Sequence, residues 1–184
     1  MARISLEPPR TLTNRLVSWY SKRKFGRDLG PTLAAGHNRR VLMTMGKVEM
    51  GSAKWNALDP QLKIMVTMKA AMTIGCEWCV DFSYWLGREA GLDADKIHAV
   101  PGWRNSTLFT PLERLALEYA EAMSTTPVTV TDELVAGLGE HLDDAQLVEL
   151  TATIALENLY GRNNLALGLA PEGLKEECAL PARD

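Results

Sequence analysis

Two cysteines stand three residues apart, at Cys76 and Cys79, in the stretch TIGCEWCVDFSYWLGREAG, residues 73–91. Such a Cys-x-x-Cys pair serves as a redox dithiol, as half of a metal site, or as two small core residues. Helical positions three and four apart share a face, so Ser83 lies on the same stripe as the two cysteines. A helix start offers free N–H groups and the positive end of the helix dipole, which lower the pKa of a nearby thiol. The stretch therefore favours thiol chemistry at Cys76 and Cys79, beside Ser83.

Zinc binding is the weaker interpretation of this cysteine pair. A structural zinc ion takes four ligands, usually from two such pairs or from one pair with histidines. The third cysteine, Cys178, stands alone near the C-terminus, and the histidines follow no ligand spacing; they are His37, His98 and His141. We therefore expect no metal and no other cofactor. Two buried structural thiols remain the alternative to a redox dithiol.

Composition and charge describe an ordinary globular protein. The chain has 184 residues, of which 46% are apolar and 23% charged, and these values predict one domain over residues 1–184. The net charge of −3 argues against nucleic acid as a partner. Residues 1–29 form a basic helical arm, because seven basic residues face Glu7 alone within residues 1–27, a net +6. The arm fits an anionic membrane, an acidic partner, an acidic neighbouring subunit or simply solvent.

No apolar run approaches the roughly 18 residues of a membrane-spanning helix. The N-terminus MARISLEPPR also lacks the apolar segment of a signal peptide. We therefore expect a cytoplasmic protein without a membrane span. Thiols are mostly kept reduced in that compartment, so a close cysteine pair there indicates redox or metal chemistry rather than a structural disulfide.

Helical periodicity dominates the chain and predicts an all-α helical bundle. The expected helices cover residues 10–24, 32–51, 58–75, 77–90, 93–100, 111–123, 131–142 and 144–169. A loop is expected at residues 101–107, and a loosely held tail at residues 173–184. Asp59 and Pro60 signal a helix start, and Gly75 and Gly91 signal left-handed helix ends. Box-like starts are expected at Thr110–Glu113 and Asp143–Gln146.

The stretch LDPQLKIMVTMKAAMTIGCEWCVDFSYWLGREAGLDADKI resembles the core of the carboxymuconolactone decarboxylase and alkylhydroperoxidase D superfamily. Members show a helix, then a Cys-x-x-Cys that opens the next helix, then an Ala-Gly-Leu turn. The later stretch LERLALEYAEAM, and the sequence from VTDELVAGLGEHL to NNLALGL, resemble the C-terminal half of the family, so the resemblance covers residues 30–172.

The resemblance implies an all-α fold assembled as a homo-oligomer, a trimer or hexamer. It also implies thiol peroxidase or disulfide reductase chemistry, with a peroxide or small organic substrate and a thiol reductant as partners. By this resemblance Cys79 attacks the peroxide and Cys76 resolves it. Helix electrostatics alone favours Cys76 as the more acidic thiol, because it lies nearer the helix start.

The sequence departs from the family pattern at the proton relay. Ser83 stands where the peroxidatic branch has a histidine, four residues after the second cysteine. Ile64 stands where that branch has a glutamate, and Trp78 replaces a histidine between the cysteines. Attack on a peroxide needs a base to form thiolate and an acid to protonate the leaving oxygen. Ser83 can orient a water molecule but is a poor base.

Other polar residues are candidates for the missing relay. They are Glu77, Asp81, His37 and Glu157. The polar set in ENLYGRNN fits either an inter-subunit seam or a pocket end that holds a polar substrate group; it comprises Glu157, Asn158, Arg162, Asn163 and Asn164. The aromatic residues Trp78, Phe82 and Trp85 lie on adjoining helix faces and are expected to wall a pocket.

The leading hypothesis is an oligomeric thiol oxidoreductase of the alkylhydroperoxidase D type with a degraded proton relay. Two alternatives remain open. One is a non-redox family member that binds or processes a small molecule, as a lactone decarboxylase does, in a pocket beside Ser83 and Trp78. The other is a catalytically silent scaffold that keeps the thiols as packing.

Overall fold

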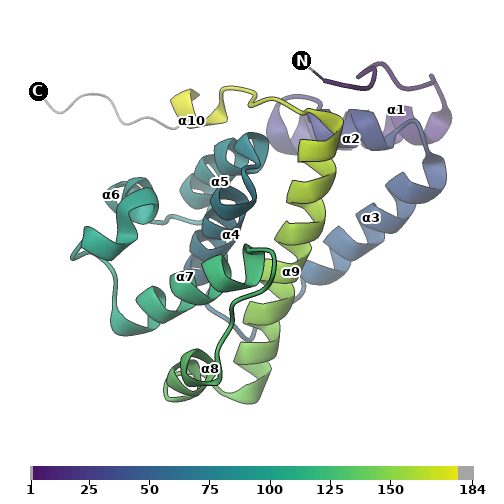
Figure 1. The fold of residues 1–184 in the computed structure, drawn as a ribbon. Coiled ribbons are helices and arrows are strands. Elements are labelled where there is room, and N and C mark those ends of the chain that lie inside the picture. Colours follow the sequence, from purple (N-terminus) through teal and green to yellow (C-terminus); the bar gives the residue numbers. More distant parts are fainter. Residues whose placement is uncertain (1, 178–184) are drawn as a thin grey trace, which may run out of the picture. The chain divides into compact units, whose positions relative to one another are not determined.

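The computed structural model describes residues 2–177, and every regular element in that range is helical (Figure 1). The all-α prediction is therefore confirmed. By backbone contacts the chain divides into two compact units, Met1–Lys54 with Ala166–Ala170 and Trp55–Leu165 with Pro171–Asp184. The single domain over residues 1–184 stays a prediction. Among the described helices, none combines the length and the apolar character that crossing a membrane requires.

The smaller unit holds α1 (Leu12–Phe25), α2 (Gly30–Ala35) and α3 (Arg39–Ser52). Thr11 caps α1 by accepting the backbone N–H of Asn14 at 3.2 Å. Asn14 in turn donates its side-chain amide to the carbonyl of Gly36 at 3.0 Å, which ties α1 to the end of α2.

The sequence predicts one helix over residues 32–51, and the structure corrects this to two helices, α2 and α3. Gly36 and His37 separate them, and Asn38 leaves helical geometry at φ −129°, ψ 100°. The Asn38 carboxamide accepts the N–H groups of Arg40 and Val41, so it caps the new helix. A Cβ at Gly36 would lie 2.8 Å from Cβ of Pro8, so this break also depends on a residue without a side chain.

The larger unit carries most of the apolar core. Its elements are α4 (Pro60–Ile74), α5 (Glu77–Glu89), α6 (Ala94–Ala99), η1 (Val100–Asn105), α7 (Pro111–Ser124), α8 (Asp132–Gly139), α9 (Asp144–Leu167, whose last two residues belong to the smaller unit) and α10 (Leu174–Glu177). Helix α4 packs against α5 and α7, and Figure 1 shows these helices close together. Met65, Met68, Leu117 and Ile154 are fully buried in this core. Each such side chain contributes about 1.5–3 kcal/mol by leaving water.

The helix ends follow the predicted capping signals. Asp59 accepts the N–H of Leu62 at 2.9 Å, and Pro60 occupies the first turn of α4. Gly75 ends α4 at φ +85°, where a residue with a side chain would be strained. Gly91 is also left-handed, at φ +67°, although α5 ends one residue earlier than predicted, at Glu89. The Asp143–Gln146 box is present as reciprocal bonds of 2.8 and 3.0 Å.

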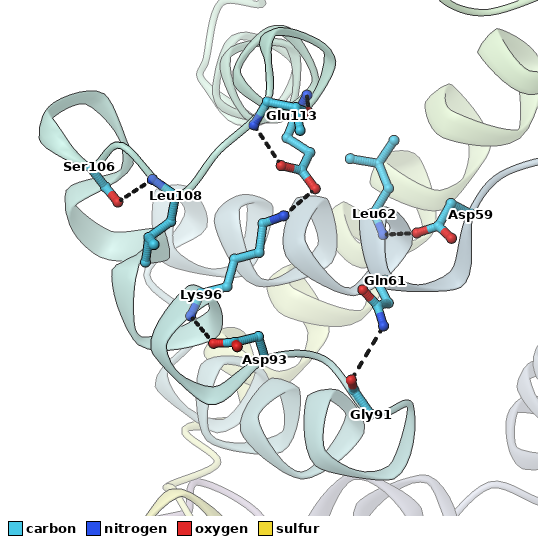
Figure 2. A network of polar contacts seen from close by, with 10 residues as sticks. Asp59, Gln61, Leu62, Gly91, Asp93, Lys96, Ser106, Leu108 and Glu113 are labelled. Atoms are coloured by element: carbon cyan, nitrogen blue, oxygen red, sulfur yellow. Dashed lines mark hydrogen bonds and ion pairs between the residues drawn. The ribbon is translucent and has the colours of Figure 1, made fainter.

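A polar network joins α6 to α7 (Figure 2). Lys96 donates to Glu113 at 2.6 Å, and the other carboxylate oxygen of Glu113 accepts the backbone N–H of Thr110. Thr110 accepts the N–H of Glu113 in return, so the predicted capping box is confirmed. Residues 101–107, predicted as a loop, contain most of the 3₁₀ helix η1 instead, because Val100 and Trp103 are buried and hold this segment against the core.

Candidate functional site

The cysteine pair lies where α4 turns into α5. Gly75 reverses the chain in its left-handed conformation, and the N–H of Cys76 bonds back to the carbonyl of Ala71 at 2.9 Å. Cys76 is then the N-cap residue of α5, and Cys79 lies in the first turn of that helix. The sequence prediction of a cysteine pair at a helix start is therefore confirmed.

Cys76 and Cys79 form a disulfide, with Cα atoms 5.3 Å apart. Both side chains are buried, at 2% and 5% exposure. The backbone N–H of Cys79 donates to Sγ of Cys76 at 3.3 Å. Such a bond, at the positive end of a helix, stabilises negative charge on Cys76 when the disulfide is reduced.

Cys79 receives its own hydrogen bond from α9. The side-chain amide of Asn164 donates to Sγ of Cys79 at 3.4 Å, between two buried residues 85 positions apart in the chain. Each sulfur therefore has a separate donor: a backbone N–H for Cys76 and a carboxamide for Cys79.

Helix α9 presents one face to the cysteine pair. Glu157, Gly161 and Asn164 are buried and follow the spacing of four and three residues that aligns side chains on a helix. A Cβ at Gly161 would lie 3.3 Å from Cδ1 of Ile74 and 3.5 Å from Cβ of Cys76. The absence of a side chain at Gly161 thus lets the backbone of α9 come close to the cysteine pair.

The carboxylate of Glu157 completes the cluster. One of its oxygens and the two sulfur atoms all lie within 4.8 Å of one another. These are metal-ligand types, but sulfurs that are bonded to each other offer no thiolate to a metal. Three donors are also one fewer than the four ligands of structural zinc.

The residues at the altered relay positions have structural partners. Ser83 is 1% exposed and donates its hydroxyl to the carbonyl of Cys79 at 2.8 Å. Ile64 packs against the apolar core, and the indole N–H of Trp78 donates to Glu172 at 2.8 Å. Ser83 therefore lies behind Cys79 on the expected stripe, and Ile64 supplies no carboxylate.

Of the other relay candidates, Asp81 anchors the chain after α9. Its carboxylate accepts the backbone N–H groups of Glu172, Leu174 and Lys175 at 2.7–3.2 Å. The tail predicted to be loosely held over residues 173–184 is therefore fixed at its start, while Cys178 and the rest of it lie outside the described residues.

Two other relay candidates, Glu77 and His37, are not grouped with the cysteine sulfurs as Glu157 is. Glu77 is exposed at the first position of α5. His37 belongs to the smaller unit, where its Nε2 lies 2.8 Å from the carbonyl oxygen of Ser5. Glu157 is the candidate whose carboxylate is grouped with both sulfurs.

The polar set of α9 divides between two faces of the helix. Asn158 donates to Ser124 at 2.9 Å, and Arg162 donates to Thr126 at 3.2 Å, so these two residues hold the segment at the end of α7. Glu157 and Asn164 face the cysteine pair instead. The spacing of positions 157, 161 and 164 places them on one helix face, and this much can be predicted from the sequence. The sequence does not indicate that this face contacts the cysteine pair.

A cavity of about 310 Å³ lies beside the junction of α4 and α5. Its walls include Met72, Gly75 and Val80 from that junction and Pro171 and Lys175 from the following tail. The aromatic residues expected to wall a pocket do not line it; Trp78, Phe82 and Trp85 stack on one another, with ring centroids 5.0 and 5.5 Å apart.

Comparison with known proteins matches residues 40–122 to the carboxymuconolactone decarboxylase family. The chain is 39% identical to the uncharacterized protein YnjA of Escherichia coli K12 over 173 residues, 92% of both chains. The matched family segment contains Cys76 and Cys79 but ends before α9.

The similarity to solved structures of the same fold covers nearly the whole chain. A variant of the debrominase Bmp8 in complex with 2,3,4-tribromopyrrole superposes with a TM-score of 0.84 at 19% identity, covering 97% of each chain. An uncharacterized peroxidase-related protein from Ralstonia eutropha, described as an alkylhydroperoxidase AhpD core, gives a TM-score of 0.81 at 16% identity and covers 98% of this chain and 96% of its own. At these identities the likeness concerns the fold.

Proposed function

Because this chain belongs to the carboxymuconolactone decarboxylase family, with an alkylhydroperoxidase D-like fold, we propose that it is a thiol oxidoreductase that cycles Cys76 and Cys79 between dithiol and disulfide. One observation carries the proposal: the two cysteines are disulfide-bonded at the N-terminus of α5, with a hydrogen-bond donor on each sulfur. Inert core thiols do not need such donors, whereas a thiolate is stabilised by them.

The proposed oxidant is an organic hydroperoxide and the proposed reductant is a dithiol. The thiolate of Cys79 attacks the hydroperoxide, the O–O bond breaks, and an alcohol leaves, which gives a sulfenic acid on Cys79. The thiol of Cys76 then displaces water from that sulfenic acid and closes the disulfide. The dithiol restores both thiols by exchange and becomes a disulfide itself.

The hydrogen bonds support this order of reaction. In the reductive half of the cycle an external thiolate attacks Cys79, and Cys76 leaves as a thiolate that the start of α5 stabilises. Ser83 fixes the carbonyl of Cys79 behind the sulfur and so positions this turn of the helix. We propose a cytoplasmic location for the cycle, where a dithiol reductant is at hand.

A second candidate function rests on the cavity at the junction of α4 and α5. At about 310 Å³ its volume suits a small organic molecule. In such a protein the cavity would hold a small organic molecule; a structure of the same fold, the debrominase Bmp8, has been solved in complex with 2,3,4-tribromopyrrole. The first candidate function predicts that a hydroperoxide oxidises the thiols, whereas the second does not require this reaction.

Thiol counting tests the proposed cycle. One equivalent of cumene hydroperoxide is expected to remove two thiols per chain from the reduced protein, and dithiothreitol is expected to restore both. Cys178→Ser is the matched control and should lose the same two thiols. Thiols that react with the oxidant only after the protein has been unfolded would contradict the redox function.

Single cysteine variants assign the roles. In Cys76→Ser the sulfenic acid on Cys79 has no resolving partner, so hydroperoxide should leave it trappable by dimedone. Cys79→Ser should bind no dimedone at stoichiometric oxidant. Labelling of Cys79→Ser instead would reverse the roles of the two cysteines while preserving the cycle.

A further inference from the structure

The cysteine pair has a buried carboxyl neighbour on α9, outside the segment that matches the family. One oxygen of Glu157 lies within 4.8 Å of both sulfur atoms, and all three residues are buried. Glu157 reaches this place from α9, where Gly161 and Asn164 lie on the same face toward the cysteines. Neither its sequence position nor its helix corresponds to Ile64, which packs in the core.

The proposed cycle requires protons to be moved at this point of the structure. Each thiol loses a proton when it becomes a nucleophile, and each leaving oxygen gains one. The cysteines are 2% and 5% exposed, so few water molecules are available to exchange these protons at neutral pH. The Ser83 hydroxyl donates to the carbonyl of Cys79, and serine is a poor base at neutral pH.

Several charged groups on the neighbouring elements have partners of their own. On α4, Lys63 pairs with Glu149 at 2.6 Å and Lys69 pairs with Glu121 at 3.2 Å. On α9, Arg162 bonds to Thr126. From α5, the two cysteine sulfurs lie near the carboxylate of Glu157, and Asn164 donates a neutral hydrogen bond to Sγ of Cys79. A thiolate and a carboxylate this close in a buried site repel each other, which favours a proton on one of them.

We propose that Glu157 is the proton-transfer residue of the cysteine pair, a role that rests on the redox cycle proposed above. Its carboxylate accepts the proton of the Cys79 thiol, and the resulting carboxylic acid protonates the alkoxide released when the O–O bond breaks. The carboxylate then accepts the proton of the Cys76 thiol and returns it to the hydroxide displaced from the sulfenic acid. Two electrons pass from the dithiol to the hydroperoxide, and Glu157 ends each turnover as it began.

The substitution Glu157→Gln tests this role, because it keeps the shape of the side chain and removes the group that can accept and release a proton. At pH 7 the rate of disulfide formation with cumene hydroperoxide should fall by roughly 10²- to 10⁴-fold, the usual worth of a positioned acid–base group. The loss should shrink above about pH 9, where solvent removes thiol protons without help. Glu118→Gln, an exposed change of the same kind on α7, is the control and should leave the profile unchanged.

Each outcome distinguishes the two proposals. If the wild-type protein forms no disulfide with hydroperoxide, the proposed cycle fails. If it does, and Glu157→Gln shows the wild-type rate and pH profile, the cycle stands and Glu157 has no part in it. A deficit in Glu157→Gln that stays constant with pH would indicate packing alone and overturn the proposal. Glu157→Asp retains a carboxyl group and should keep the wild-type profile at a reduced rate; behaviour like that of the glutamine variant would also overturn it.

Discussion

Gly161 sets how closely α9 approaches the two cysteines. Around the place of its missing Cβ lie Cδ1 of Ile74 at 3.3 Å, an oxygen of Glu157 at 3.4 Å and Cβ of Cys76 at 3.5 Å. A single methyl group there is slightly tight, whereas a longer side chain has no space. The proton-transfer geometry proposed for Glu157 therefore depends on a residue that performs no chemistry.

Substitution of Gly161 makes this dependence measurable. Gly161→Ala should be close to neutral in the free energy of unfolding, since a helix-propensity gain of up to about 1 kcal/mol offsets the tight contact with Ile74. Gly161→Leu should cost about 1–3 kcal/mol by overpacking and should slow disulfide formation by moving α9 away. Urea unfolding and thiol oxidation rates check both. A leucine variant with wild-type stability and rate would show that α9 is not held close at Gly161.

The sequence alone was informative about some residues and silent about others. The cysteine spacing and the turn at Gly75 are local signals, so the position of the cysteine pair at the start of α5 could be predicted. The grouping of Glu157 with the cysteines joins positions about 80 residues apart, and no local rule specifies which helix faces that stripe. From the sequence, Glu157 is therefore one relay candidate among several, and the packing of α9 against the cysteines distinguishes it.

Between elements, a partly buried ion pair joins α4 to α9. Lys63 donates to Glu149 at 2.6 Å, and the backbone N–H of Ala57 donates to its other oxygen at 2.7 Å. Burial favours the neutral acid, but the bonds from Lys63, Ala57 and Leu58 outweigh it and hold the pKa of Glu149 below its ordinary value. The carboxylate form is thus preferred in the folded state.

This lowered pKa fixes the sign of a pH effect on stability. The folded state releases the proton of Glu149 more readily than the unfolded state does, so its contribution is fully present above the ordinary glutamate pKa of about 4.3 and is lost as the pH falls through the lowered value. Glu149→Gln should cost about 1–3 kcal/mol at pH 7, because Lys63 loses its charged partner and keeps only the carbonyl of Trp55. Its deficit relative to wild type should narrow below about pH 4.

Urea unfolding at about pH 7 and about pH 3.5, on either side of the ordinary glutamate pKa, measures both effects. Glu118→Gln, on an exposed position of α7, is the control and should match wild type at each pH. A deficit for Glu149→Gln that is equal at both pH values would mean that this carboxylate does not contribute to acid unfolding.

Capping signals account for the elements that were predicted well. Asp59, Thr110 and Asp143 are side chains that bond to nearby backbone, so α4, α7 and α9 begin near their expected residues. The break between α2 and α3 and the 3₁₀ helix η1 were missed. Both depend on tertiary contacts, with Pro8 against Gly36 in one case and the burial of Trp103 in the other.

At the scale of the whole molecule, α9 exposes an apolar stripe on the face away from the core. Val148 is 68% exposed and Leu159 41% exposed, and their spacing of eleven residues places them on one side of the helix. Ala152 and Ala155 lie between them on the same side, which leaves this surface flat enough for close packing. Apolar side chains that gather on one exposed helix face are candidates for an interaction site.

We expect the stripe to bury itself against another copy of the chain, so the protein should run as a trimer or larger in light scattering at micromolar concentration. Val148→Glu with Leu159→Glu places two buried carboxylates in that contact and should release smaller species, because an unpaired buried charge is costly. Val128→Glu changes an equally exposed valine outside α9 and is the matched control, expected to leave the mass unchanged. A wild-type monomer would contradict the assembly, and a double variant with the wild-type mass would place the contact on another surface of the subunit.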